Sequence, residues 1–315
     1  MVEGGGDRPL VSVAMVTYKH EAFIAEAIES VLAQDLEDWE LVIGEDCSPD
    51  GTRAIAERYA AQHPGKIRVL TSETNLGGRK NFARTLEATR GVYLSQLDGD
   101  DYFTSPGRLA RMVGVLEGND ELAWAYHGVR EVDDAGADLH LDRVGDPERL
   151  LDRLDVLRIC PAASCGVLHR RPDAWDFPQW WWDSPVGDWA LHLLLTGDRQ
   201  IAYVPEILAA HRNHGGGIWG GDSEVKQIRL RAKIRAAIAP GVPQVPERLL
   251  VEAAFKDRYE LGRAFERSGR PREASAEYAW CRAAADQAPA GFKHSRLRSR
   301  WLRSKLRGLL PAARG

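Results

Sequence analysis

The chain has 315 residues, of which 44% are hydrophobic and 28% charged, and its net charge is −4. This length fits one large domain or one domain with an appendage. The acidic balance argues against a nucleic-acid partner, and no apolar run approaches the ~20 residues that a membrane span needs. The N-terminus lacks a basic region followed by an apolar core, so we expect no signal peptide.

Cysteine usage indicates a reducing compartment. The chain has four cysteines, at Cys47, Cys160, Cys165 and Cys281. They are few for this length, and the close pair lacks the neighbouring ligands of a zinc site. We therefore expect reduced thiols in a cytoplasmic protein, with peripheral membrane contact as an open alternative.

The first hundred residues alternate between strand and helix patterns. Repeated βα units of this kind predict an α/β fold with a mostly parallel sheet and helices on both faces. In chain order the predicted elements are strand Val11–Thr17, helix Glu21–Ala33, strand Glu40–Ile43, helix Thr52–Gln62, strand Ile67–Leu70, helix Asn81–Thr89 and strand Val92–Leu97.

The pattern is mixed past Leu122 and becomes helical from Ser223. We expect a first domain over residues 1–222 and a helical extension over 223–315, in which Arg248–Ala285 forms a helical pair. The tail carries seven Lys or Arg and no acid between Lys293 and Arg307. Its apolar residues recur at near-helical spacing; they are Phe292, Leu297, Trp301, Leu302, Leu306 and Leu309.

This basic amphipathic tail has two interpretations. It packs on the preceding helices or on a second subunit, which would make a homodimer, or it lies on an anionic membrane surface. We favour protein packing because the preceding helical pair offers a ready partner.

Polar residues follow three of the predicted strands. Thr17 and Tyr18 end the first, Asp46 follows the second, and an acidic group comes after the fourth. The acidic group is Asp98, Asp100 and Asp101, placed around Gly99. Ligands of open α/β sheets bind outside the carboxyl ends of the strands. Crowded carboxylates are costly, so the group indicates a solvated turn, a divalent cation, or a cation that carries a phosphate.

Five segments together resemble glycosyltransferase family 2, which has the GT-A fold. They are "VSVAMVTYKHEAFIAEAIESVLAQ", "ELVIGEDCSPDGT", "NLGGRKNFARTLEATRGVYLSQLDGDDYF", "GDWALHLLL" and "HRNHGGGI". The resemblance covers roughly residues 9–220, with a donor-binding half at about 9–103 and an acceptor half at about 104–222. It implies an inverting transfer of a sugar from a nucleotide diphosphate to an acceptor, with a divalent cation, Mn²⁺ or Mg²⁺.

The resemblance also implies the roles of residues around the diphosphate. Asp100 and His214 correspond to metal ligands of the family, and Asp98 lies near the ribose or the metal. Gly99 lets the backbone approach the nucleotide closely. Asp101 is interpreted as a cap of the next helix. The glycines after His214 fit a loop that closes over the donor.

The nucleotide base has its own expected contacts. By resemblance, Asp46 accepts a hydrogen bond from the base, usually uracil, which favours a UDP-sugar, and Thr17 and Tyr18 pack on that base. Lys80 and Asn81 lie where the family contacts the nucleotide. Here "GRKNFAR" departs from the commoner "ARN", so the cation that meets the nucleotide stays open among Arg79, Lys80 and Arg84.

An inverting transfer needs one general base, and "GDWALHLLL" resembles the element that carries it. Gly187 replaces the first acid of that element, and Asp188 keeps the second and is the predicted base. A helix N-cap is the structural alternative for Asp188.

The acceptor is expected near a tryptophan cluster and a serine. Three consecutive tryptophans, residues 180–182, cannot all face inward on one regular element, so Trp181 and Trp182 are candidates for stacking on an acceptor sugar. Core packing is the alternative. Ser164 lies in a segment that resembles the family's acceptor region.

Two other function classes compete with a glycosyltransferase. A sugar nucleotidyltransferase would carry a glycine-rich, Arg-containing loop after the first strand, and "VTYKHEAF" is not such a loop. A non-catalytic nucleotide-sugar-binding or scaffold protein would not need the retained Asp100, Asp188 and His214. The sequence leaves the sugar and the acceptor open.

Overall fold

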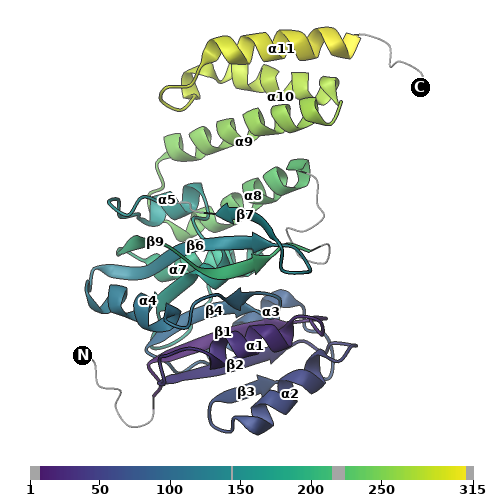
Figure 1. Cartoon of the computed structure of the whole chain (residues 1–315). Coiled ribbons are helices and arrows are strands. Elements are labelled where there is room, and N and C mark those ends of the chain that lie inside the picture. The colour runs from purple at the N-terminus through teal and green to yellow at the C-terminus, as the bar shows by residue number, and fades with distance from the viewer. Residues whose placement is uncertain (1–7, 143–144, 215–223, 310–315) are drawn as a thin grey trace. The chain divides into compact units, whose positions relative to one another are not determined.

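The computed structural model describes residues 8–142, 145–214 and 224–309, and the chain divides into two compact units, residues 1–217 and 218–315 (Figure 1). The expected domain boundary between residues 222 and 223 lies outside the described residues, as do the glycines at 215–217.

The first unit is built on a mixed sheet with the strand order β3-β2-β1-β4-β8-β6-β9-β5, in which β7 pairs with β6. The four N-terminal strands of the sheet are parallel, and β8 joins β4 in the antiparallel sense. The strands are β1 Val11–Thr17, β2 Trp39–Glu45, β3 Ile67–Leu70, β4 Tyr93–Asp98, β5 Tyr102–Phe103, β6 Leu122–Val132, β7 Asp138–Asp142, β8 Val167–Arg170 and β9 Gln200–Arg212.

Helices cover both faces of this sheet, as the βα pattern predicts. They are α1 Ile24–Leu32, α2 Thr52–Gln62, α3 Gly78–Glu87, α4 Arg108–Glu117, α5 Arg153–Arg158, α6 Gln179–Asp183 and α7 Gly187–Thr196. Side chains alternate along each strand. Val13 and Met15 therefore enter the main core with Ile28, whereas Ala14 packs on the opposite face with Leu86.

Several predicted bounds are confirmed and others shift. β1, α2 and β3 have the bounds expected from the sequence. α1 begins at Ile24 rather than Glu21, because the carbonyl of His20 accepts hydrogen bonds from the backbone N–H groups of Phe23 and Ile24 and forms a turn there. α3 begins earlier than predicted, at Gly78.

The register of the parallel strands sets the position of the site. Thr17 pairs with Glu45, and Val16 pairs with Asp98. The carboxyl ends of β1, β2 and β4 are therefore level, and the loops that follow them meet at one edge of the sheet.

A buried arginine joins the parallel and antiparallel parts of the sheet. Arg108 donates to Ser95 Oγ (2.8 Å), His127 Nε2 (3.0 Å) and the carbonyl oxygens of Cys165 and Val167 (2.9 Å each). Burial lowers the pKa of Arg108 to about 9, and burial together with Arg108 lowers that of His127 to about 3. His127 is therefore a neutral acceptor for this guanidinium.

The second unit contains the helices α8 Glu224–Ile238, α9 Glu247–Arg267, α10 Pro271–Ala283 and α11 His294–Leu309. α9 and α10 pack closely, since a Cβ at Gly262 would lie 2.4 Å from Tyr278 Cε1. Glu266 accepts hydrogen bonds from the hydroxyls of Tyr278 (2.9 Å) and Ser304 (3.0 Å), and the latter bond joins α11 to this pair.

The tail packs partly on the preceding helices. Leu297 is buried with the apolar side chains of α9 and α10, and Phe292 and Trp301 pack against them. Leu302 and Leu306 stay exposed, at 43% and 63%, and nothing is described of the Leu309 side chain. Contact with a membrane or a second subunit stays a prediction. Among the described residues, none of the helices combines the length and the apolar character needed to cross a bilayer.

The amino end of the sheet holds a carboxylate with several partners. Glu40 of β2 is 2% exposed and accepts hydrogen bonds from Ser12 Oγ (2.6 Å), from the backbone N–H of Arg90 (2.7 Å) and from the Arg90 guanidinium, with Arg68 alongside. Burial alone would raise the pKa of Glu40, but these contacts outweigh it and lower the pKa below its ordinary 4.5.

We predict that Glu40→Gln lowers the free energy of unfolding at pH 7 by ~2 kcal/mol, because a buried carboxylate loses its charge-assisted hydrogen bonds. The wild-type contribution is complete above pH 4.5 and disappears as pH falls through the lower folded pKa. The difference between the two proteins should therefore shrink in acid. Urea unfolding from pH 7 to pH 3 measures it.

The matched control is Glu57→Gln, which removes an exposed ion pair with Arg53 (2.7 Å) and should change stability by less than ~0.5 kcal/mol. A Glu40→Gln effect no larger than this control, or one that does not depend on pH, would contradict the prediction.

Candidate functional site

The loop after β4 lies against the end of β1. The backbone N–H of Gly99 donates to the carbonyl of Val16 (2.9 Å), and Asp98 Oδ2 accepts from Ser164 Oγ (3.0 Å). A Cβ at Gly99 would lie 2.6 Å from Thr17 Oγ1 and 2.9 Å from His20 Nδ1. Only glycine allows this approach, so Gly99 is needed here for packing between β1 and β4.

Two of the acids in this loop are strongly perturbed; Asp101 is buried, and Asp98 is partly buried. Burial, followed by the charges of Asp101 and Asp100, raises the pKa of Asp98 well above its ordinary value. Burial and the charge of Asp100 raise that of Asp101 in the same way. Such perturbation is frequent at functional sites. The loop is therefore not the solvated turn that was one alternative for the sequence.

Arg212, at the end of β9, stabilises the loop. Its backbone N–H donates to Asp101 Oδ1 (2.8 Å), and its Nε donates to the carbonyl of Asp100 (3.0 Å). Nη2 reaches Glu26 of α1 at 2.7 Å. The interpretation of Asp101 as a helix cap is wrong, because α4 begins at Arg108 and the Asp101 carboxyl binds the end of β9 instead.

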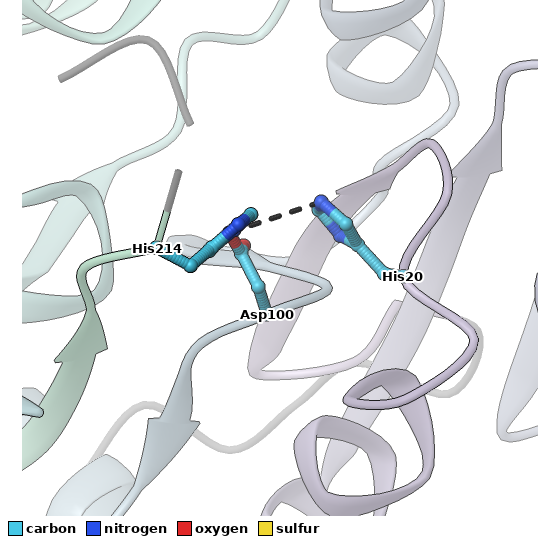
Figure 2. A group of neighbouring side chains, drawn as sticks. All are labelled: His20, Asp100 and His214. Atoms are coloured by element: carbon cyan, nitrogen blue, oxygen red, sulfur yellow. Dashed lines mark hydrogen bonds and ion pairs between the residues drawn. The ribbon is translucent and has the colours of Figure 1, made fainter. Parts of the chain in front are cut away.

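The structure brings Asp100 together with two histidines. Asp100 Oδ2 lies 2.8 Å from His214 Nε2 and 3.8 Å from His20 Nε2, and Figure 2 shows the three side chains directed toward one another. One ligand atom from each lies within 4.8 Å of the others. The sequence analysis missed His20. The available signal was its position, since "TYKH" follows the first strand as the acids follow the fourth.

These residues fit a divalent cation. One carboxylate and two imidazoles form a common donor set for such ions. Burial lowers the pKa of His20, although the charge of Asp100 opposes this, and a neutral imidazole is the form that binds a metal. Among the described residues, the buried atoms Thr17 Oγ1 and His20 Nδ1, which both face Gly99, have no hydrogen-bond partner.

The expected base contacts lie beside this group. Both carboxylate oxygens of Asp46 accept backbone N–H groups, from Leu76 at 2.7 Å and from Gly77 at 3.0 Å. A carboxylate has about four lone-pair directions, so Asp46 keeps capacity for a further donor. Thr17 is buried, and Tyr18 is 39% exposed with the Lys19 ammonium 5.2 Å from its ring centroid.

Asp188, the predicted base, lies in the first turn of α7. Val186 precedes this helix as its N-cap, so the N-cap alternative for Asp188 does not hold. Its Oδ1 accepts from the backbone N–H of Trp189 at 2.7 Å. The charge of Asp188 contributes to the pKa values of Asp98 and Arg79, which places it in the electrostatic environment of the acidic loop.

Sequence comparison assigns the family. The model of "Glycosyl transferase family 2" matches residues 12–173. The chain belongs to glycosyltransferase family 2. It is similar to the uncharacterized protein Rv1520 of Mycobacterium tuberculosis, with 33% identity over 220 residues that make up 66% of this chain and 60% of that protein. It is also similar to the putative glycosyltransferase EpsE of Bacillus subtilis, with 39% identity over 109 residues, 35% of this chain and 39% of that one.

Solved structures confirm the GT-A type of fold. The mannosyltransferase PcManGT of Pyrobaculum calidifontis, in complex with GDP-Man and Mn²⁺, aligns with a TM-score of 0.57 over 97% of this chain and 88% of that one, at 18% identity. Residues 1–349 of S. aureus TarS with UDP-GlcNAc align with a TM-score of 0.53 over 87% and 92% of the two chains, at 16% identity. At such identities the likeness shows the fold alone. The chain spans about 60% of the length of its mycobacterial relatives.

Two residues of α3 in this family 2 chain have structural roles that the sequence did not reveal. Asn81 is buried and donates to the carbonyl of Gly44 (2.7 Å), while its oxygen accepts from Arg84 (2.9 Å). Arg84 also donates to the carbonyl oxygens of Thr71, Glu45 and Leu70. The prediction that Asn81 contacts the nucleotide does not fit this burial. Asn81 and Arg84 hold the ends of β2 and β3.

The other two cations of α3 differ in exposure. Lys80 is exposed. Arg79 donates to the carbonyl of Ser184, stacks on the Trp181 ring with its guanidinium carbon 4.5 Å from the centroid, and has its pKa lowered by burial to about 10. Because Arg84 is fully used within the sheet, Arg79 and Lys80 remain the candidates for a nucleotide contact.

The tryptophans divide between core and surface. Trp181 is fully buried and packs against Phe177 with ring centroids 4.3 Å apart, so the expectation that it stacks on an acceptor is corrected to a core role. Trp182 is 39% exposed and keeps the acceptor interpretation. Ser164 is 8% exposed and holds Asp98, which places the expected acceptor segment directly beside the acidic loop.

Gly187 stands where the family resemblance placed an acid, and the structure shows why no larger residue fits. A Cβ at this position would lie 2.6 Å from Cδ1 and 3.0 Å from Cε1 of Phe82, a residue of α3. A side chain here would push α7 away from α3. Asp188, the next residue, depends on this close approach for its position.

We predict that Gly187→Ala lowers stability by ~1–3 kcal/mol, because the new methyl group overlaps the Phe82 ring. Combining it with Phe82→Ala should restore space, so that the double variant is less destabilised than the sum of the single variants by at least ~1 kcal/mol. Chemical unfolding of the three variants and wild type gives this coupling energy.

Gly114→Ala is the control, since a Cβ at that exposed helical position meets nothing within 4 Å. It should be neutral or stabilise the helix by up to ~1 kcal/mol. If the stability changes of Gly187→Ala and Phe82→Ala simply add in the double variant, the contact between Gly187 and Phe82 does not fix the position of α7.

Proposed function

We propose that this chain is a metal-dependent, inverting glycosyltransferase that moves a sugar from a nucleotide diphosphate, with a UDP-sugar favoured, to an acceptor nucleophile. The observation that carries the proposal is the pairing of Asp100 with His214 beside Asp98 at the carboxyl edge of the sheet, with Asp188 near enough to act on the pKa of Asp98. Membership in family 2 and the nucleotide-sugar complexes of the structural neighbours, TarS with UDP-GlcNAc and PcManGT with GDP-Man, support it.

On the donor side, the reaction requires stabilisation of negative charge on the leaving group. A diphosphate leaving group gathers negative charge as the glycosidic bond breaks. Asp100 and His214 would hold a divalent cation, Mn²⁺ or Mg²⁺, which when bound supplies positive charge beside the diphosphate. Asp98 approaches the ribose or the cation, and Asp46 and Tyr18 hold the base. Thr17 is buried beside Gly99, so the packing on the base that the sequence predicts for Thr17 and Tyr18 falls to Tyr18.

The acceptor side depends on Asp188 as the general base. One of its oxygens accepts from the Trp189 backbone, and the other is left to take the proton from the acceptor. The charge of Asp188 acts on the buried Arg79 guanidinium, so this carboxylate has a cation in its surroundings. Trp182 supplies an exposed ring on which an acceptor sugar can stack.

We predict that Asp100→Ala abolishes Mn²⁺-dependent binding of UDP, because the only carboxylate of the histidine–aspartate cluster is removed. Calorimetry of UDP with and without Mn²⁺ measures the effect. Asp173→Ala, an exposed acid outside the cluster, is the control and should bind as wild type does. Unchanged metal-dependent binding by Asp100→Ala would remove the metal assignment.

We predict that Asp188→Asn keeps donor binding within about threefold but lowers the rate of sugar release or transfer by ~10²–10⁴-fold, the usual contribution of a general base. A panel of UDP- and GDP-sugars first identifies a donor that wild type hydrolyses with Mn²⁺. The control is Asp183→Asn, because Asp183 is an exposed acid of α6 whose side chain accepts from Gln179 (2.8 Å).

Rates within about tenfold of wild type for Asp188→Asn would require a different base. If wild type binds nucleotides tightly but hydrolyses none of the nucleotide sugars in the panel, the alternative of a non-catalytic nucleotide-sugar-binding protein is favoured.

A further inference from the structure

We propose that His20 is a third protein ligand of the divalent cation, beside Asp100 and His214, and that the two imidazoles make this site prefer a first-row transition ion over Mg²⁺. The inference deepens the proposed function, on which it rests. It concerns a residue that the family resemblance does not assign and that lies far from the other two in the sequence (Figure 2).

The distances between the candidate ligand atoms are close to those in a divalent-metal site. Bonds of ~2.1 Å from one ion place two ligand atoms ~3.0 Å apart at a right angle and ~4.2 Å apart when they are opposite. Here His214 Nε2 and His20 Nε2 lie 2.8 Å and 3.8 Å from Asp100 Oδ2, and one ligand atom from each of the three residues lies within 4.8 Å of the others. Shifts of well under 1 Å would suffice for shared coordination.

Among the described residues, neither ring nitrogen of His20 makes a hydrogen bond. Nε2 is too far from Asp100 for a hydrogen bond at 3.8 Å, and Nδ1 is buried without a partner. Burying an imidazole without hydrogen bonds costs free energy. Ligation through Nε2 would give the ring a strong polar partner on the side that faces Asp100, which simple packing would not.

The backbone of His20 is held firmly in place. Its N–H donates to Thr52 Oγ1 (2.9 Å), and its carbonyl accepts from Phe23 and Ile24 at the start of α1. Lys19 just before it adopts a left-handed conformation, with φ of 61°. This turn directs the His20 ring toward the loop after β4. The Phe23 ring then packs on His214, with centroids 5.4 Å apart, so one turn positions both imidazoles.

The donor set determines which ion the site prefers. Mg²⁺ prefers oxygen ligands and near-ideal octahedral geometry, whereas imidazole suits transition ions. A site with Asp100 and one histidine would discriminate weakly. A second imidazole from His20 adds nitrogen character, and this strengthens binding of Mn²⁺ or Co²⁺ more than that of Mg²⁺.

The test measures metal binding directly, without a sugar donor. Free Mn²⁺ is quantified by electron paramagnetic resonance during titration of the full chain, and Mg²⁺ is measured by competition. We expect His20→Ala and the size-matched His20→Gln to weaken Mn²⁺ binding about tenfold or more, with a smaller effect on Mg²⁺. His140→Ala, which changes an exposed histidine of β7, should bind as wild type does. Thermal unfolding followed by circular dichroism shows that each variant is folded.

The outcomes separate this proposal from the proposed function. If Asp100→Ala loses Mn²⁺ but both His20 variants bind it as wild type does, His20 is not a ligand, and the metal-dependent function stands. If wild type binds no Mn²⁺ at millimolar concentration, or if Asp100→Ala and the His20 variants all match wild type, both ideas fail. Equal weakening of Mn²⁺ and Mg²⁺ by the His20 variants would overturn the claimed selectivity.

Discussion

The burial of like-charged carboxyl groups around Gly99 is the constraint on which the site depends. Asp101 is buried and Asp98 is partly buried, and burial together with the neighbouring carboxylates raises the pKa of both. Arg212 compensates in part through its backbone N–H and guanidinium. The repulsion between carboxyl groups that Arg212 does not offset favours a bound cation at this loop.

The two ends of the parallel strands show the contrast between structural and functional charge. At the amino end, Glu40 is 2% exposed, and Ser12, Arg68 and Arg90 satisfy it and lower its pKa. At the carboxyl end, burial dominates and raises the pKa of Asp98. Carboxylates on β2 and β4, two strands apart, thus differ in role because their partners differ. The satisfied group fixes the sheet, and the unsatisfied group is available to a ligand.

The sequence predicted the parts of the fold that depend on local pattern. Strands such as Val11–Thr17 are runs of residues that favour β-structure, and their carboxyl ends identified the acidic edge. Side chains whose role depends on tertiary packing were assigned less well. Asn81 is polar at an expected nucleotide position, yet it bonds the sheet backbone, and Trp181 is enclosed by other rings. His20 could not be found by spacing, because its partners come from β4 and β9, about 80 and 190 residues away.

The helix α3, which is expected to contact the nucleotide, also positions Asp188, the predicted general base. Through Phe82, α3 accepts the close approach of Gly187, and through Arg79 it binds the carbonyl of Ser184 just before α7. Both contacts lie within four residues of Asp188. A side chain at position 187 and the loss of Arg79 would each move the carboxylate without touching it. The glycine that departs from the family's usual acid is therefore compatible with a base at Asp188, because it allows the helix pairing that holds this residue near the acidic loop.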